Sequence, residues 1–112
     1  MKTIYHKQEN PWGRTTVIVM AGGKAFAMVT VTDKEQDVAL IHDLMVHPSK
    51  QGQGFGDALL AEACDEGKRM GAKTLRLSAE PGSWVQAWYG RNGFRVVGIQ
   101  VYDGHALDIM EK

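Results

Sequence analysis

Apolar and polar residues alternate along much of the first half of the chain, and each alternating stretch predicts a β-strand. Residues 14–33 contain two such stretches, separated by glycines 22 and 23, whose backbone freedom suits a tight hairpin turn. A third apolar stretch runs from about Asp37 to His47 and is ended by Pro48. Residues 2–8 predict a further short strand.

The spacing of apolar residues changes after this third stretch, from every second position to every third or fourth. This spacing predicts a helix from about Phe55 to Met70, and Gly71 follows it as a common C-terminal residue. One face of the helix is apolar, which predicts that this face is buried. The predicted buried stripe consists of Leu59, Leu60, Ala63, Cys64, Gly67 and Met70.

The last third of the chain predicts strands around one short helix. Residues 73–80 alternate as a strand, and residues 83–93 form a short helix that begins at a serine cap and stops at a glycine. Residues 94–104 and 105–112 predict a strand and its hairpin partner.

This order of elements predicts an α+β fold built on one mixed sheet. The strand, helix and strand from Asp37 to Ala79 form a βαβ unit with a parallel pair, and the other strands pair most simply as antiparallel neighbours. At 112 residues the chain is expected to form a single domain, residues 1–112, with few helices.

Composition narrows the classes of partner. The 13 basic and 13 acidic residues cancel, so neither nucleic acid nor an anionic membrane surface is expected as a partner. One cysteine, Cys64, excludes an internal disulfide, and the four histidines lack metal-ligand spacing, so no metal is expected. The sequence has no apolar run typical of a signal peptide or a membrane span, and a cytoplasmic protein is expected.

Three alternating glycines, Gly52, Gly54 and Gly56, lie between the third predicted strand and the long helix. A loop that enters a helix presents unpaired backbone N–H groups, and glycines let an anion such as a phosphate approach them. The alternative is a tight connection that uses glycine for its geometry alone. The loop lacks the Gly-Lys-Ser/Thr of an ATP-type phosphate loop and the G-x-G-x-x-G of a dinucleotide site.

Two motifs resemble one enzyme family. Residues 51–56, Gln-Gly-Gln-Gly-Phe-Gly, resemble the Q/R-x-x-G-x-G/A loop of the GNAT N-acetyltransferase superfamily, with a strand before it and an amphipathic helix after it. Residues 88–94, WYGRNGF, are similar to the Y-x-x-x-G-F segment of the same family. The resemblance covers about Lys24 to the C-terminus. It implies a GNAT-like acyl-CoA N-acyltransferase fold, acetyl-CoA as cofactor, and acetyl transfer to a primary amine of a small molecule or protein.

The resemblance also implies which residues bind the cofactor. The loop amides would hold the pyrophosphate, with Gln51 as a neutral donor, and the end of the preceding strand would pair with the pantetheine arm as an added strand does. The cofactor-binding residues expected on this basis are Leu44, Met45, Val46, Gln51, Gly52, Gln53, Gly54, Phe55 and Gly56.

Tyr89 and His42 are the candidate catalytic residues. Tyr89 occupies the family's tyrosine position, and a phenol, with a pKa of ~10, suits protonation of a thiolate leaving group; the alternative is a core tyrosine beside Trp88. His42 fits a proton acceptor, while a structural histidine, Asp43 or a water molecule are alternatives. Strict alternation along the strand puts His42 on the same face as Leu44 and Val46.

The family's usual two helices between its first two strands have no room in residues 2–16. The acceptor site is therefore expected to be open, or completed by a second chain or by the substrate itself, and a homodimer is expected. A different function with the same loop is a non-catalytic acyl-CoA-binding sensor or docking module.

Overall fold

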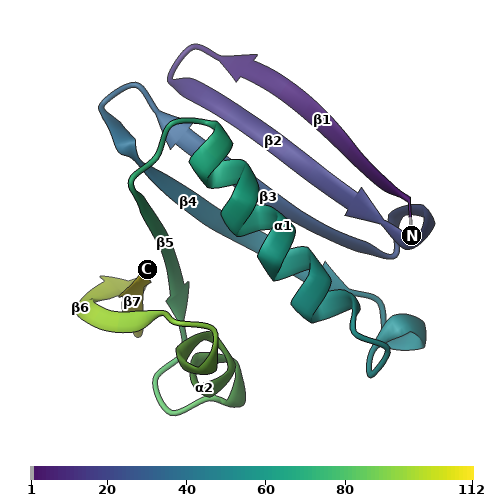
Figure 1. The fold of residues 1–112 in the computed structure, drawn as a ribbon. Helices are drawn as coiled ribbons and strands as arrows, with labels where there is room; N and C mark the ends of the chain where they lie inside the picture. The colour runs from purple at the N-terminus through teal and green to yellow at the C-terminus, as the bar shows by residue number, and fades with distance from the viewer. Residues whose placement is uncertain (1) are drawn as a thin grey trace.

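The computed structural model describes residues 2–112 as a seven-stranded sheet with two α-helices (Figure 1). The strand order in the sheet is β1-β2-β3-β4-β5-β7-β6. In chain order the elements are β1 (Thr3–Asn10), β2 (Gly13–Met20), the short 3-10 helix η1 (Ala21–Gly23), β3 (Ala25–Thr32), β4 (Glu35–Val46), the short 3-10 helix η2 (Pro48–Lys50), α1 (Phe55–Arg69), β5 (Thr74–Ala79), α2 (Trp84–Arg91), β6 (Arg95–Tyr102) and β7 (His105–Glu111).

One parallel pair interrupts an otherwise antiparallel sheet, as the sequence predicted. β4 and β5 pair in parallel from Val38 opposite Thr74 to Leu40 opposite Arg76, and every other neighbouring pair is antiparallel. β4 continues for six residues beyond Leu40 without pairing to β5, and the two strands diverge (Figure 1). The β5-facing edge of this part of β4 therefore has free backbone groups.

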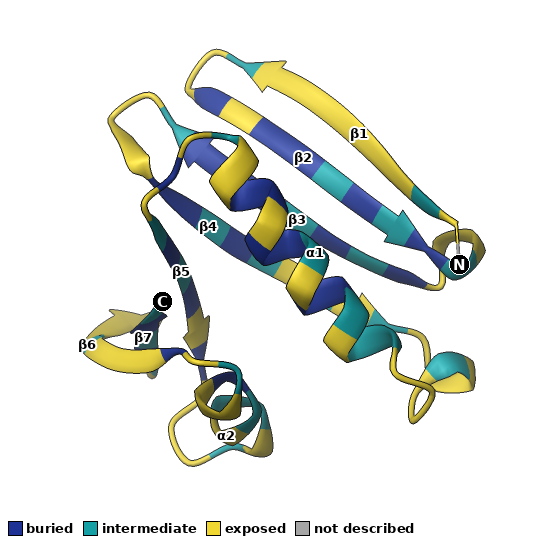
Figure 2. Cartoon of the chain, viewed as in Figure 1, coloured by how far each residue is buried: buried dark blue, intermediate teal, exposed yellow. Residues whose placement is uncertain are grey.

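Helix α1 lies across β2, β3 and β4 and covers one face of the sheet (Figure 2). The predicted stripe is confirmed from Leu59 to Gly67, whereas Met70 is half-buried at the end of the helix. A Cβ built at Gly67 would lie 2.6 Å from Leu75 Cδ2 and 2.9 Å from Ala39 Cβ. Glycine at this position therefore lets the helix approach the sheet closely.

Glu66 lies on the same buried face, although its residue type predicts solvent exposure. Only 2% of Glu66 is exposed, and its carboxylate accepts hydrogen bonds from Thr16 Oγ1 at 2.7 Å and from Arg69 Nε at 2.9 Å. Desolvation opposes the charged form, but the two hydrogen bonds together with the positive charges of Lys7 and Arg69 outweigh it and lower the pKa of Glu66. The buried charge is thus paired rather than isolated.

A β-bulge interrupts the pairing of β4 with β3. His42 pairs with Met28 and Met45 pairs with Phe26, so two residues of β4, Asp43 and Leu44, oppose one residue of β3. Asp43 has a φ of 55°, in the left-handed region. An inserted residue of this kind shifts the side chains that follow to the opposite face.

The bulge corrects one prediction. His42 and its partner Met28 line a cavity on the face away from α1, whereas Leu44 and Val46 pack against the core under the helix. The expectation that His42, Leu44 and Val46 share one face is therefore wrong, because strict alternation holds only where the strand has no extra residue.

The two edges of the sheet differ in character. β1 joins β2 directly, with no helix between them, and its exposed residues are mostly polar. β6, at the other edge, exposes Ile99, Val101 and Tyr102 by 67%, 70% and 71%. Such an edge is a surface on which chains can associate, and the homodimer stays a prediction.

Candidate functional site

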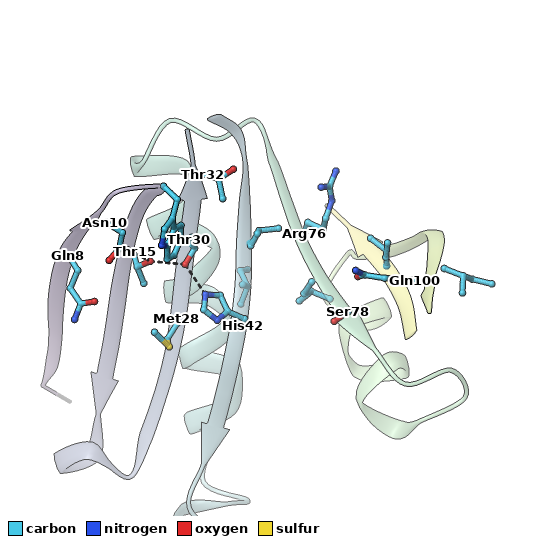
Figure 3. Close-up of a pocket in the computed structure, with 16 residues that line it drawn as sticks. Gln8, Asn10, Thr15, Met28, Thr30, Thr32, His42, Arg76, Ser78 and Gln100 are labelled. Carbon is cyan, nitrogen blue, oxygen red and sulfur yellow. Dashed lines mark hydrogen bonds between the residues drawn. The ribbon is translucent and has the colours of Figure 1, made fainter. Parts of the chain in front are cut away.

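Two cavities flank β4 where it separates from β5. The first, here called the loop cavity, has a volume of about 580 Å³ and lies between the end of β4, the glycine loop and α2. The second, here called the sheet cavity, has a volume of about 930 Å³ and lies on the face away from α1 (Figure 3). Leu40, Ile41 and His42 line the sheet cavity, while Leu44, Met45 and Val46 line the loop cavity. One strand therefore contributes to both.

The glycine loop leaves the start of α1 open. Gly54 is the N-cap residue, and no side chain caps the helix. The first helical hydrogen bond runs from Ala58 N–H to Gly54 C=O at 3.1 Å, so the N–H groups of Phe55, Gly56 and Asp57 have no partner within the helix. These groups and the helix dipole favour an anion at this end.

Two of the three glycines in the loop are required by its backbone geometry. Gly52 and Gly54 have φ values of 76° and 85°, which side chains rarely adopt, and a Cβ at either position would meet nothing within 4 Å. A Cβ at Gly56 would instead lie 3.7 Å from the Trp88 ring, an ordinary contact. Loop geometry thus explains two of the glycines, and the space around those two is open.

The predicted cofactor residues gather around the loop cavity, with two exceptions. Gln53 and Phe55 do not line it, and Phe55 packs against the core instead. Gln51 lines the cavity, but its Nε2 donates to Val46 C=O at 3.0 Å and so ties the loop to the end of β4. Gln53 Nε2 similarly donates to Ser49 C=O at 3.1 Å.

Tyr89 is both a core residue and a lining residue of the loop cavity. It is 8% exposed, and its ring centroid lies 5.2 Å from that of Trp88 and 5.9 Å from that of Phe94. Burial raises the pKa of Tyr89 above its ordinary value of 10.0, so the phenol keeps its proton at neutral pH.

Asp57 is a lining residue of the loop cavity that the sequence analysis missed. Its Oδ1 accepts a hydrogen bond from Trp88 Nε1 at 2.8 Å, which joins α1 to α2. An acidic residue in the first turn of a helix is common because it complements the dipole. The sequence therefore carried no signal that this residue lines the cavity.

His42 belongs to the sheet cavity and not to the cavity that holds Tyr89. Its Nε2 lies 2.8 Å from Thr30 Oγ1, which in turn lies 2.9 Å from Thr15 Oγ1 (Figure 3). Its Nδ1 lies 3.0 Å from Asp43 Oδ2. The two candidate catalytic residues therefore approach β4 from opposite faces of the sheet.

Three further expectations from the sequence concern the cysteine, a metal site and membrane-spanning segments. Cys64 is buried in the core, and desolvation raises the pKa of its thiol, so it rests as a small neutral side chain. No group of three metal-ligating side chains occurs in residues 2–112. In the same residues, no helix is both long enough and apolar enough to cross a membrane.

A family model described as an acetyltransferase (GNAT) domain matches residues 12–96. The solved structure of the ribosomal-protein-S18-alanine N-acetyltransferase from Escherichia coli is 29% identical in sequence, with a TM-score of 0.70, covering 92% of this chain and 70% of that chain. No curated protein sequence matches the chain.

Two solved structures of similar length share the fold at lower identity. An acetyltransferase from Bacillus subtilis, solved in complex with CoA, is 18% identical with a TM-score of 0.73, covering 98% of this chain and 97% of that chain. An IAA acetyltransferase from Bacillus cereus is 18% identical with a TM-score of 0.72, covering 98% of each chain.

Proposed function

The chain belongs to the GNAT acetyltransferase family, and from this premise we propose that it transfers the acetyl group of acetyl-CoA to a primary amine of a small molecule or protein. Its mixed sheet with two helices is the GNAT acyl-CoA N-acyltransferase fold. One observation carries the proposal: the uncapped start of α1, with its free amides, opens into a cavity beside an unpaired edge of β4.

The residues around the loop cavity fit coenzyme A. The free amides of Phe55 and Gly56 and the dipole of α1 suit the pyrophosphate, and the open space at Gly52 and Gly54 admits it. Beyond Leu40 no strand pairs with β4 on its β5 side, and Gln51 Nε2 occupies only the C=O of Val46 at the end of the strand. The remaining backbone groups on this side can pair with the amides of the pantetheine arm. Acetyl-CoA, when bound, supplies the acetyl group as a reactive thioester.

Tyr89 would donate a proton and His42 would accept one, on the two sides of β4. The Tyr89 hydroxyl, protonated because burial raises its pKa, holds a proton for the leaving sulfur. A backbone N–H of Met45 or Val46 would polarise the thioester carbonyl. His42 Nε2 takes the proton that the attacking amine gives up. The amine would enter through the sheet cavity, which stays open because no helix separates β1 from β2.

Calorimetric titration with acetyl-CoA, followed by mass spectrometry of mixtures with candidate amines, tests this proposal. We expect micromolar binding, a raised melting temperature through mass action, and a mass increase of one acetyl group on an amine nitrogen. Acetyl-CoA that neither binds nor raises the melting temperature would contradict the proposal.

One observation favours a second function, a non-catalytic acyl-CoA-binding module. Tyr89 lines the loop cavity, whereas His42 lines the sheet cavity. A sensor needs only the loop cavity, because that cavity would hold the acyl-CoA. Tight CoA binding without transfer to any amine of a broad panel, including peptides and a cell extract, would favour this alternative.

A further inference from the structure

We infer that Asp43 and Thr30 are positioning residues, which hold His42 in the single tautomer that carries its proton on Nδ1 and leaves Nε2 as the acceptor. The inference rests on the proposed function for its catalytic meaning, but the tautomer itself is measurable without turnover. It gives a function to the β-bulge and to the buried hydroxyls of Thr15 and Thr30, which the sequence analysis did not single out.

Four hydrogen bonds form a continuous series at the sheet cavity; Figure 3 labels Asn10, Thr15, Thr30 and His42 of this series. Asn10 Nδ2 lies 3.3 Å from Thr15 Oγ1, Thr15 Oγ1 lies 2.9 Å from Thr30 Oγ1, and Thr30 Oγ1 lies 2.8 Å from His42 Nε2. The last bond joins His42 Nδ1 to Asp43 Oδ2 at 3.0 Å. This series of hydrogen bonds spans β1, β2, β3 and β4.

The donor capacity of each group fixes the direction of the whole chain. An ionised carboxylate only accepts, so the proton between His42 and Asp43 is on Nδ1. The Nε2 of a neutral imidazole then only accepts, so the Thr30 hydroxyl donates to it. Thr30 has a single proton, so its oxygen accepts from Thr15. Thr15 is in the same position and accepts from the amide N–H of Asn10, which only donates.

The two hydroxyls in this series of hydrogen bonds are buried. Thr15 is 4% exposed and Thr30 is 3% exposed. A buried hydroxyl left without a partner is destabilising, so this series of hydrogen bonds is most stable when every bond is made. In the opposite tautomer the hydroxyls of Thr30 and Thr15 could rotate and re-form their bonds, but Nδ1 would carry no proton and Asp43 would lose its donor.

The β-bulge is what brings the carboxylate to the ring. Neighbouring residues of a regular strand point to opposite faces, so His42 and Asp43 would not touch in an unbulged strand. The left-handed backbone of Asp43, with φ of 55°, coincides with the contact. Asp43 is also the only carboxylate at hydrogen-bond distance from His42 in residues 2–112. Arg76, which lines the same cavity, pairs with two other carboxylates, those of Glu35 and Glu111.

This arrangement prepares Nε2 to accept a proton. The incoming amine replaces the Thr30 hydroxyl at Nε2, and its proton moves to Nε2 while the N–H electron pair stays on the amine nitrogen. The Asp43 carboxylate then stabilises the imidazolium through Nδ1–H. The hydroxyls of Thr30 and Thr15 can rotate, so they can re-form their bonds around the charged ring.

The test is the ¹⁵N–¹H correlation spectrum of the imidazole rings, recorded where the histidines are neutral. His42→Gln identifies the His42 signals among those of the four histidines. We expect the pattern of an Nδ1-protonated ring in the parent protein. Asp43→Asn should remove the preference for this tautomer and make the Nε2-protonated form visible, because the asparagine amide can accept from Nδ1–H through its oxygen or donate to a bare Nδ1 through its N–H₂. Asparagine also tolerates a left-handed backbone as aspartate does.

Matched variants separate positioning from stability. Asp103→Asn makes the same chemical change at another left-handed aspartate, in the β6–β7 turn, and should change neither spectrum nor rate. Asp43→Asn should lower kcat by about 10²-fold with little change in the Kd of acetyl-CoA. Thr30→Val should keep the Nδ1 proton but shift the Nε2 signal, and Thr30→Ser should restore that signal.

The spectrum and the rate separate two kinds of failure. An Nε2-protonated His42 in the parent protein, or the absence of any Nε2-protonated form in Asp43→Asn, would overturn the inference even if the enzyme is active. The expected tautomer in the parent protein and the appearance of the Nε2-protonated form in Asp43→Asn would support it. If no amine is then acetylated, the proposed function fails and the assignment of the positioning residues stands.

Discussion

The two helices begin in opposite ways. α2 begins at Ser83, whose hydroxyl accepts the N–H of Gln86 at 3.2 Å, and Gln86 Oε1 accepts the N–H of Gly82 at 2.9 Å. α1 begins at Gly54 with no capping side chain. A helix start that satisfies its own donors is closed to ligands, while one that leaves them free depends on a ligand or water. We therefore assign binding to the start of α1 and a fixed scaffold for Tyr89 to α2.

Removing the Tyr89 hydroxyl tests the chemical side of this comparison and has the largest expected effect. Tyr89→Phe keeps the ring contacts with Trp88 and Phe94. If the hydroxyl is the general acid, kcat should fall by ~10²–10⁴, while the Kd of acetyl-CoA changes little. Single-turnover rates and calorimetry measure the two quantities separately. Turnover within about twofold of the parent, far below that range, would make Tyr89 a core aromatic only.

Filling the open start of α1 tests the binding side. Gly54→Val places a β-branched residue at φ 85°, which strains the backbone and covers the free amides, so the Kd of acetyl-CoA should rise more than tenfold. Gly104→Val is the matched control, because Gly104 has a φ of 80° and open surroundings in the β6–β7 turn. Both variants should lose about 1–2 kcal/mol of stability from the left-handed backbone. Equal acetyl-CoA affinities in the two variants would refute the loop as the binding site.

Removing the cap of α2 should instead affect stability. Ser83→Ala deletes the acceptor for Gln86 N–H and should lower the free energy of unfolding by about 1 kcal/mol, or about 4–8 °C in melting temperature. Acetyl-CoA affinity should stay within about twofold, an energy of roughly 0.4 kcal/mol. Ser83→Asp keeps a capping oxygen and should restore the melting temperature. Side chains of α2 line the loop cavity, so a marked loss of affinity in Ser83→Ala would mean that the cap is needed to hold them in place.

Neutralising Asp57 should give the smallest effect, in the direction of tighter binding. Its carboxylate lines the loop cavity, where it repels an anionic pyrophosphate. Asp57→Asn keeps an oxygen for Trp88 Nε1 and should strengthen CoA binding by about two- to fivefold, as expected for 0.3–1 kcal/mol near a helix end. The gain should shrink in high salt. Asp65→Asn, on the exposed side of the same helix, should leave the affinity unchanged, and weaker binding by Asp57→Asn would contradict this assignment.

Hydrophobic periodicity was sufficient to predict the order of the strands and helices and the parallel pair, because burial on one face imposes these patterns on the sequence. The bulge at Asp43 left no such trace. It lies between two runs of consecutive apolar residues, 40–41 and 44–46, which show no alternation that an extra residue could disturb. The face of His42 was therefore predicted correctly relative to Leu40 but not relative to Leu44.

The contacts that complete the site join residues distant in sequence. Asp57 meets Trp88 across 31 positions, and Thr30 meets His42 across 12. No local pattern encodes such pairs, because each residue has an ordinary role in its own element. Glu66 shows the same limit, since its partner Thr16 is 50 positions away. The motifs located the glycine loop and Tyr89, whereas the tertiary structure supplies the chemistry of their surroundings.

The position of β4 between two cavities has a kinetic consequence. A donor held in the loop cavity and an acceptor held in the sheet cavity reach the strand from opposite faces, so neither has to leave before the other can enter. We expect both substrates to be present together when the acetyl group moves, without an acetylated form of the protein. Double-reciprocal plots of initial rates should therefore intersect, and parallel lines would indicate that the first product departs before the second substrate arrives.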